Sequence, residues 1–335
     1  MSRLILTFTN SGAGSLKTAR LADCVIGVEH RFVWGRLPAS DDLNLSLARW
    51  STERDDSSPH WLDNLTGTIF EDARDQGLGL IEFCERFDAI DLWVDPDPNS
   101  QLQLIWLLDF LRSHPNVTSR LAILQADCVI GGQQPGGLAA QQLRLIPVGR
   151  DHLDIAGAAW AAWRAPTPEA WFGLLQQALA GLPRLRDSVI ALLEELPSRN
   201  CGLGATEMRM LELISAGHLH PYDLFPGHEK PNERRTFGYW EVGALLDGLA
   251  RCSMPAVSGL DEGPFDLAMH DAEDRHRRYS RSRLALTELG KAIVAGAADF
   301  SRHNPIDRWW GGTELTSDRL WRWDAKKQTL LAPQP

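Results

Sequence analysis

Residues 4–17 of this chain, LILTFTNSGAGSLK, determine how its fold is interpreted. The first six of them are aliphatic, aromatic or β-branched, which is typical of a buried strand. Two glycines follow within residues 10–14, where a tight turn is expected, and residues 15–21 then have the composition of a helix. A strand, a turn and a helix in this order form the opening unit of an α/β sheet.

Three further short apolar runs occur at residues 24–28, 89–94 and 121–124. Between the last two, residues 99–112 repeat their apolar side chains at helical spacing. Strands that alternate with helices indicate an open, mostly parallel sheet with helices flanking it. We therefore predict an α/β domain over residues 1–150, in which the polar residues 40–59 form a solvated loop or an excursion before residues 61–84.

Residues 151–200 are expected to form a helical linker. Leu, Trp and Ala recur there at helical spacing, and Pro166, Pro168 and Pro183 divide the pattern into two or three helices.

Residues 201–335 have the order of a winged helix-turn-helix domain. Residues 206–216, 222–225 and 239–251 fit three helices, residues 284–287 fit the return strand of a wing, and residues 288–294 fit the helix after it. The wing itself would be a long loop over residues 255–283. The tail carries tryptophans at 309, 310, 321 and 323. We expect them to pack the end of the chain onto the body of the protein, between its domains, with a base-stacking surface as the alternative.

Composition indicates an ordinary globular protein, with 44% hydrophobic and 23% charged residues in a chain of 335. The net charge of −10 argues against indiscriminate binding to nucleic acid, because neutralisation of phosphates is the main source of that affinity. No apolar run approaches the roughly 18 residues of a membrane helix, and the N-terminus lacks the apolar region of a secretory signal. Five widely spaced cysteines suit a reducing compartment, so a cytoplasmic location without a membrane partner is expected.

The segment after the first strand is a candidate anion site. Free N–H groups at the start of a helix, two glycines, two hydroxyls and a lysine would suit a phosphate or a similar small ligand. The candidate residues are Asn10, Ser11, Gly12, Gly14, Ser15 and Lys17. The segment matches neither the Walker motif nor the dinucleotide fingerprint, so it identifies no cofactor, and a capped helix after a glycine turn is the alternative.

Asp95 and Asp97 are the candidate catalytic residues. With Asp91, they lie at or just beyond a predicted central strand, where the carboxyl edge of an open sheet usually places ligands. The alternative is a plain loop in which Ser100 or Asn99 caps the following helix. No recognised catalytic motif occurs, and the spacing of His218, His220, Asp223 and His228 fits no zinc motif, so no metal is predicted.

An arginine-rich stretch falls where the wing is expected. Arginines beside tyrosine and serine can hold a phosphate backbone, so the candidate nucleic-acid contacts are Arg275, Arg277, Arg278, Arg281 and Arg283. Two observations oppose this interpretation. The helix at residues 239–251 carries carboxylates that would face phosphates, and acidic residues at 271–274 offer partners within the chain, so a solvated loop is the alternative.

Several stretches together resemble the uncharacterised bacterial family called domain of unknown function 1835, with its C-terminal companion domain. They are residues 11–16 (SGAGSL), 92–93 (LW) with Asp97, 101–104 (QLQL), 159–168, 202–203 (GL) with Thr206 and Glu207, 306–309 (IDRW) and 321–324 (WRWD). Relatives commonly have an aspartate where this chain has Asn10 and another where it has His30. The resemblance implies no activity, because none is established for the family.

Three hypotheses of function follow. The favoured one is a regulator or adaptor whose α/β domain senses a small anionic ligand and whose winged-helix module contacts a protein or DNA. The second is an enzyme that acts on a phosphorylated or nucleotide-like substrate through Asp95 or Asp97. The third is a structural scaffold for protein interactions. The first is favoured because the C-terminal domain has a recognisable architecture, whereas no catalytic base has an evident partner.

Overall fold

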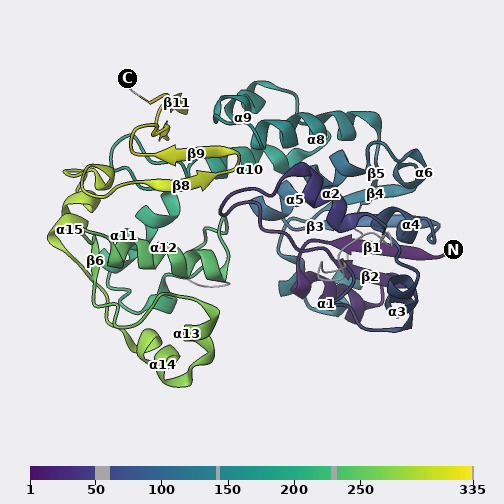
Figure 1. Ribbon diagram of the computed structural model, residues 1–335, viewed down its shortest axis with the longest axis horizontal. Coiled ribbons are helices and arrows are strands. Elements are labelled where there is room, and N and C mark those ends of the chain that lie inside the picture. The colour runs from purple at the N-terminus through teal and green to yellow at the C-terminus, as the bar shows by residue number, and fades with distance from the viewer. Residues whose placement is uncertain (50–60, 141–143, 228–231, 334–335) are drawn as a thin grey trace. The chain divides into compact units, whose positions relative to one another are not determined.

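The computed structural model describes residues 1–49, 61–140, 144–227 and 232–333. The chain divides into two compact units (Figure 1). Unit 1 comprises Met1–Phe32, Leu37–Ala161 and Ala178–Leu185, and unit 2 comprises Val33–Arg36, Ala162–Gln177 and Arg186–Pro335. Residues 151–200, which the sequence analysis treats as a separate linker, are shared between these two units.

Unit 1 contains a mostly parallel five-stranded sheet, as predicted. Its strands lie in the order β2 (Cys24–Gly27), β1 (Arg3–Thr7), β3 (Ala89–Val94), β4 (Leu121–Gln125) and β5 (Ile146–Pro147). The first four are parallel to their neighbours, and β5 pairs antiparallel with β4. The chain builds the sheet outward from its centre, to β2 on the side of β1 and to β4 and β5 on the side of β3. The strand order therefore reverses between β1 and β3. In open α/β sheets ligands usually bind at such a switch point.

The helices of unit 1 are α1 (Asn10–Ala19), α2 (Ser40–Leu47), α3 (Thr68–Asp75), α4 (Leu80–Cys84), α5 (Pro98–Leu111), α6 (Pro115–Thr118), α7 (Pro135–Ala140), the 3₁₀ turn η1 (Ile130–Gly132) and α8 (Arg150–Trp163), which ends in unit 2. The predicted helix at residues 99–112 is α5. The loop predicted at residues 40–59 is wrong where α2 forms, because its acidic first turn suits the helix dipole and Leu43 and Leu47 are buried one turn apart. Residues 50–59 of that prediction lie outside the described residues.

The first helix starts five residues earlier than predicted. The Thr9 hydroxyl accepts a hydrogen bond from the Gly12 amide and caps α1, so Gly12 and Gly14 are helical rather than part of a turn. One face of the sheet buries α1 together with η1 and α7 in an apolar cluster that includes Leu16, Trp93 and Ile130.

Helix α5 lies inside unit 1, with 12 of its 14 residues buried. Its buried amide side chains satisfy backbone groups: Gln101 donates to the Asp95 carbonyl, Gln103 to the Phe8 carbonyl and Asn99 to the His30 carbonyl. Such pairing is needed because a buried polar group without a partner is costly. The polar residues of α5 therefore fix the loops at the carboxyl edge of the sheet.

In its described residues, unit 2 is mainly helical and has three small antiparallel strand pairs. Its helices are α9 (Glu169–Gly173), η2 (Leu174–Gln176), α10 (Pro183–Leu193), which begins in unit 1, α11 (Ala205–Ser215), η3 (Pro221–Asp223), α12 (Tyr239–Arg251), α13 (Leu267–Asp271), α14 (Glu273–Arg281), α15 (Glu288–Val294) and η4 (Phe300–Arg302). Its strand pairs are β6 (Val257–Ser258) with β7 (Ala285–Leu286), β8 (Asp307–Trp310) with β9 (Thr313–Thr316), and β10 (Arg322–Asp324) with β11 (Thr329–Leu331).

The helices predicted at residues 206–216, 239–251 and 288–294 correspond to α11, α12 and α15. The predicted return strand is β7, and the second helix is only the 3₁₀ turn η3. The prediction of one long wing loop is wrong, because α13 and α14 form between β6 and β7. We call residues 259–283 the insertion.

Residues 286–290 (LTELG) form the junction between β7 and α15, and two of them have structural roles there. Thr287 caps α15 by accepting from the Gly290 amide, and its hydroxyl donates to the Pro255 carbonyl. A Cβ at position 290 would lie 2.1 Å from the Ala256 carbonyl oxygen. Glycine is therefore required for α15 to approach the backbone that leads into β6.

The tryptophan-rich tail packs on the body of the protein, as predicted, but these contacts lie within unit 2 rather than between two domains. The Trp310 ring meets Trp163 edge-on at 4.6 Å between centroids, and its N–H donates to the Leu192 carbonyl. Asp324 is paired with Arg199 at 2.9 Å. None of the described helices is both long and apolar enough to cross a membrane.

Candidate functional site

The structure does not bring all the predicted anion-binding residues together. Asn10, Ser11 and Gly14 are exposed, Ser15 is half-buried, and the Asn10 side chain donates to Glu29. Lys17 lies in the last turn of α1, about 10 Å along the axis from Asn10 given a rise of about 1.5 Å per residue. Its ammonium lies over the Phe70 ring instead, at 5.9 Å from the centroid.

The buried side of the same corner is occupied by a carboxylate. Asp95 is 1% exposed, and its oxygens accept from the Thr9 hydroxyl at 3.1 Å and from the Ile130 amide at 2.6 Å. Its position ties β1, β3 and η1 together at the switch point of the sheet. A negative charge beneath the start of α1 also disfavours a second anion there, so the geometry favours the capped-helix alternative.

Asp97 is the N-cap of α5. Its carboxylate accepts from the Ser100 amide at 3.0 Å and from the Ser100 hydroxyl at 2.6 Å. The sequence-based choice of Ser100 or Asn99 as the cap is wrong, because proline at position 98 fits the first helical position and leaves Asp97 just before the helix. Asp91 is buried within β3 and is paired with Arg3 at 3.2 Å, and burial raises its pKa. All three aspartates thus make hydrogen bonds or ion pairs within unit 1.

His30 stands where the resembled family commonly has an aspartate. Its ring stacks on Phe32 at 5.5 Å between centroids and meets Trp106 at 4.6 Å. Burial lowers the pKa of His30, and an uncharged ring fits these aromatic neighbours better than a carboxylate would.

Three of the five candidate arginines are neutralised within unit 2. Arg275 and Arg278 both bind Glu262, at 3.1 and 2.7 Å, and this pairing holds the pKa of Glu262 at about 2, with the Arg278 hydrogen bond as the main cause. Arg277 is paired with Glu273 and Asp274 on its own helix, α14. Arg281 and Arg283 are exposed and, in the part of the chain that the structure describes, form no ion pair.

Helix α12, which would be the recognition helix of a winged-helix protein, is partly covered by the insertion. Six of its 13 residues are buried, among them Gly243, where an added Cβ would lie 2.1 Å from the Phe265 ring. Phe265 also contacts Tyr239 and Trp240 at the start of α12. The insertion therefore occupies part of the α12 surface near Gly243, whereas Tyr239, Trp240, Gly248 and Arg251 stay exposed.

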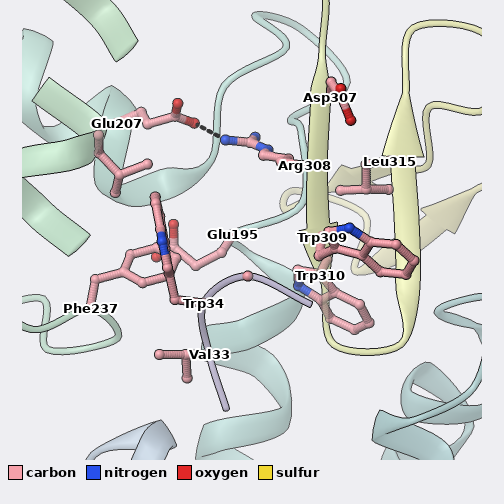
Figure 2. Close-up of a pocket in the computed structure, with 12 residues that line it drawn as sticks. Val33, Trp34, Glu195, Glu207, Phe237, Asp307, Arg308, Trp309, Trp310 and Leu315 are labelled. Carbon is pink, nitrogen blue, oxygen red and sulfur yellow. Dashed lines mark hydrogen bonds and ion pairs between the residues drawn. The ribbon is translucent and has the colours of Figure 1, made fainter. Parts of the chain in front are cut away.

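Unit 2 contains a cavity of about 280 Å³ that the sequence analysis did not predict (Figure 2). We call it the aromatic pocket. Figure 2 shows Trp34 and Phe237 on one side of it and Trp309 and Trp310 of β8 on the other. The remaining lining residues are Val33, Gly35, Glu195, Glu207, Leu245, Asp307, Arg308 and Leu315.

One ion pair in the pocket wall joins β8 to α11. The Arg308 Nη1 atom lies 3.0 Å from Oε2 of Glu207, as the dashed line in Figure 2 marks. The same Oε2 accepts from the Gly204 amide at 2.8 Å, which caps the first turn of α11. A single carboxylate therefore connects the pocket to the start of this helix.

The other charges of the pocket are nearly balanced. Glu195 is buried and bonded to Thr206 and Arg234; burial raises its pKa, and the charge of Arg234 opposes that shift. The Arg36 guanidinium lies over the Trp309 ring, at 5.4 Å from the centroid. Asp307 is exposed.

Sequence reasoning missed this pocket because four distant segments build it, at residues 33–35, 195–207, 237–245 and 307–315. The tail tryptophans give a signal through the alternative of a stacking surface, and Glu207, Asp307 and Arg308 are marked only by the family resemblance.

A comparison with protein-family models and another with curated proteins find no match for this chain. The resemblance to domain of unknown function 1835 therefore stays a prediction.

Proposed function

We propose that this protein is a cytoplasmic ligand-responsive regulator or adaptor, whose unit 2 binds a small planar molecule in the aromatic pocket. The observation that carries the proposal is a cavity of about 280 Å³ walled by four aromatic side chains and one Arg–Glu pair. Binding sites for small molecules are typically mostly apolar clefts of roughly 300–1,000 Å³ with a few polar groups that orient the ligand. The cysteines are all free, which supports a reducing compartment.

The same wall of the aromatic pocket would connect a bound ligand to the helices that we propose as the interaction module. Glu207 caps α11 and Leu245 lies on α12, so a ligand in the pocket contacts both helices. We propose that α11 to α15 are a winged-helix variant that carries the insertion. The partly covered α12 and the neutralised arginines favour a protein rather than DNA as its partner.

The ligand site is proposed in unit 2 rather than at residues 10–17, because Lys17 lies far from the start of α1 and Asp95 occupies the corner. The structural bonds of Asp95 and Asp97 likewise favour a binding protein over an enzyme.

A thermal-shift panel of planar heterocycles tests this function. Purines, pterins, flavins and indoles would be added at millimolar concentration, and at least one class is expected to raise the melting temperature. A ligand at 100 times its Kd stabilises the folded state by about 2.7 kcal/mol. The shift is expected to vanish in Trp309→Ala, because that ring forms a wall of the pocket.

The matched control is Trp321→Ala, which removes a half-buried tryptophan of the same tail outside the pocket and is expected to keep the shift. No shift with any class, or an equal shift in Trp309→Ala, would contradict the proposal.

A further inference from the structure

We infer that an exposed aromatic surface of unit 2 docks a basic segment of a partner protein that also carries apolar side chains. The surface consists of Tyr239 and Trp240 at the start of α12 and of Leu267 and His270 on α13, and we call it the insertion patch. The inference rests on the part of the proposed function that gives α11 to α15 a protein partner, and it names the surface and the chemistry of that partner.

The four side chains form one continuous surface. The Trp240 ring lies 5.3 Å from that of Tyr239 and 5.6 Å from that of His270, between centroids. The rings of Tyr239 and His270 lie 6.0 Å apart. Leu267 precedes His270 by three residues on α13, so both lie on one face of that helix. The buried Phe265 contacts Tyr239 and Trp240 and holds both rings in place.

The insertion patch is open to solvent. Leu267 is 62% exposed, Trp240 43% and Tyr239 39%. Single exposed apolar side chains are ordinary on protein surfaces, whereas several in contact mark a site of interaction. Tryptophan and tyrosine are also enriched among the residues that contribute most to binding between proteins. The patch therefore has the composition of a protein-binding surface.

Two aspartates stand directly beside the patch. Asp266 follows Phe265 and Asp271 follows His270, and the rings of Phe265 and His270 both contact Trp240. Both aspartates are exposed and, among the residues that the structure describes, neither pairs with a lysine or an arginine. Their charges are therefore free to meet a cation from outside the chain.

The first turn of α14 adds two more carboxylates to this rim. Glu273 and Asp274 are exposed and share the guanidinium of Arg277. Four carboxylates beside one guanidinium leave the rim negative. Such a rim complements a basic protein segment and repels the phosphates of DNA. An arginine or lysine of the segment would also gain from lying over the Trp240 ring.

Synthetic peptides test the two parts of this chemistry separately. One alternates leucine with arginine, a second leucine with glutamine, a third arginine with glutamine, and a fourth leucine with glutamate. Fluorescence polarisation with the full chain at low salt is expected to give the arginine–leucine peptide an affinity about tenfold or more above each of the others, because it alone supplies both contacts. Its affinity should fall as salt is added. Equal affinities, or no binding of this peptide, would overturn the inference.

Trp240→Ala places the binding on the patch. It is expected to weaken the arginine–leucine peptide about tenfold or more, as for a tryptophan at the centre of an interface. Leu267→Ala should weaken it as well, and this variant decides the question if Trp240→Ala proves unfolded by circular dichroism. The matched control is Met254→Ala, which truncates a 48% exposed side chain just beyond α12 and is expected to change nothing. Unchanged binding in the two patch variants would rule out docking there.

The rim charges are tested by replacing Asp266 and Asp271 together with asparagine, which still caps α13 at position 266. The affinity is expected to fall about fivefold at low salt, as for the loss of two exposed ion pairs. The control replaces Asp41 and Asp42 of α2 with asparagine, which removes the same charge from unit 1. An equal fall in both double variants would show that binding follows only the net charge of the chain, and would contradict the inference.

Mixed-sequence duplex DNA is the competing occupant. If the full chain binds it and Trp240→Ala does not, the patch belongs to nucleic acid and the inference is wrong. The peptide titrations contain no pocket ligand, so their failure leaves the aromatic pocket standing. Failure of the thermal-shift panel overturns the ligand site and leaves the insertion patch standing.

Discussion

Replacing Phe265 with alanine is expected to lower the free energy of unfolding of unit 2 by about 4 kcal/mol, as for other buried phenylalanines. The ring is 6% exposed and packs on Gly243 of α12, where no other side chain would fit. It also contacts Phe225 and Tyr279, at 5.5 and 4.9 Å between centroids, and so joins the segment after η3 to α12 and α14. Urea denaturation followed by tryptophan fluorescence measures the loss.

Leu267→Ala is the control for this change. Leu267 belongs to the same insertion but is 62% exposed, so its truncation is expected to change stability by less than about 0.5 kcal/mol. Amide hydrogen exchange should also quicken along α12 in Phe265→Ala alone. A loss below about 1 kcal/mol for Phe265→Ala would contradict the partial covering of α12 and would return that helix to consideration as a DNA-binding surface.

Replacing Asp95 with alanine is expected to destabilise unit 1 by about 3 kcal/mol, because it leaves the buried Ile130 amide without its acceptor and also removes the bond to Thr9. Asp97→Ala removes only a helix cap and is expected to cost about 1 kcal/mol. Hydrogen exchange of β1 and β3 would report the difference between the two variants.

The comparison of the two aspartates distinguishes a structural role from a catalytic one. Catalytic carboxylates are often removed with little loss of stability, since they are held for chemistry rather than for packing. An Asp95→Ala protein as stable as the unaltered chain would therefore contradict the structural role assigned to Asp95 and favour the enzyme hypothesis.

The sequence sufficed to predict the parallel sheet of unit 1 and several helices of both units. Those predictions depended on apolar periodicity, which is strongest where an element is buried on one face or on both. β1 and β3 are short apolar runs of this kind, and α12 keeps its apolar residues on one side.

Local sequence signals predict the wrong secondary structure where contacts with another part of the chain determine it. Two glycines suggested a turn at residues 10–14, but the Thr9 cap and the packing of η1 make the segment helical. The composition of the arginine-rich segment predicts a loop, but the segment forms α14. There Glu273 and Arg277 pair four residues apart, as on one face of a helix, and Tyr279 is buried.

The aromatic pocket could not be predicted from the sequence, for a different reason. Its walls come from segments separated by up to about 280 positions, and no local pattern records which of them meet. Each wall residue alone resembles an ordinary packing residue. The sequence pattern marks Trp309 and Trp310 as packing residues, and it marks Glu207, Asp307 and Arg308 only through the family resemblance.

Hydrogen exchange with and without the tightest-binding planar heterocycle tests the central claim most directly. We claim that the aromatic pocket receives a ligand and passes its presence to α11 through Glu207. The account predicts slower exchange at residues 205–208 and along β8 when the ligand is bound, and no slowing there in Trp309→Ala. Binding that protects other parts of the chain, while residues 205–208 and β8 exchange as before, would contradict it.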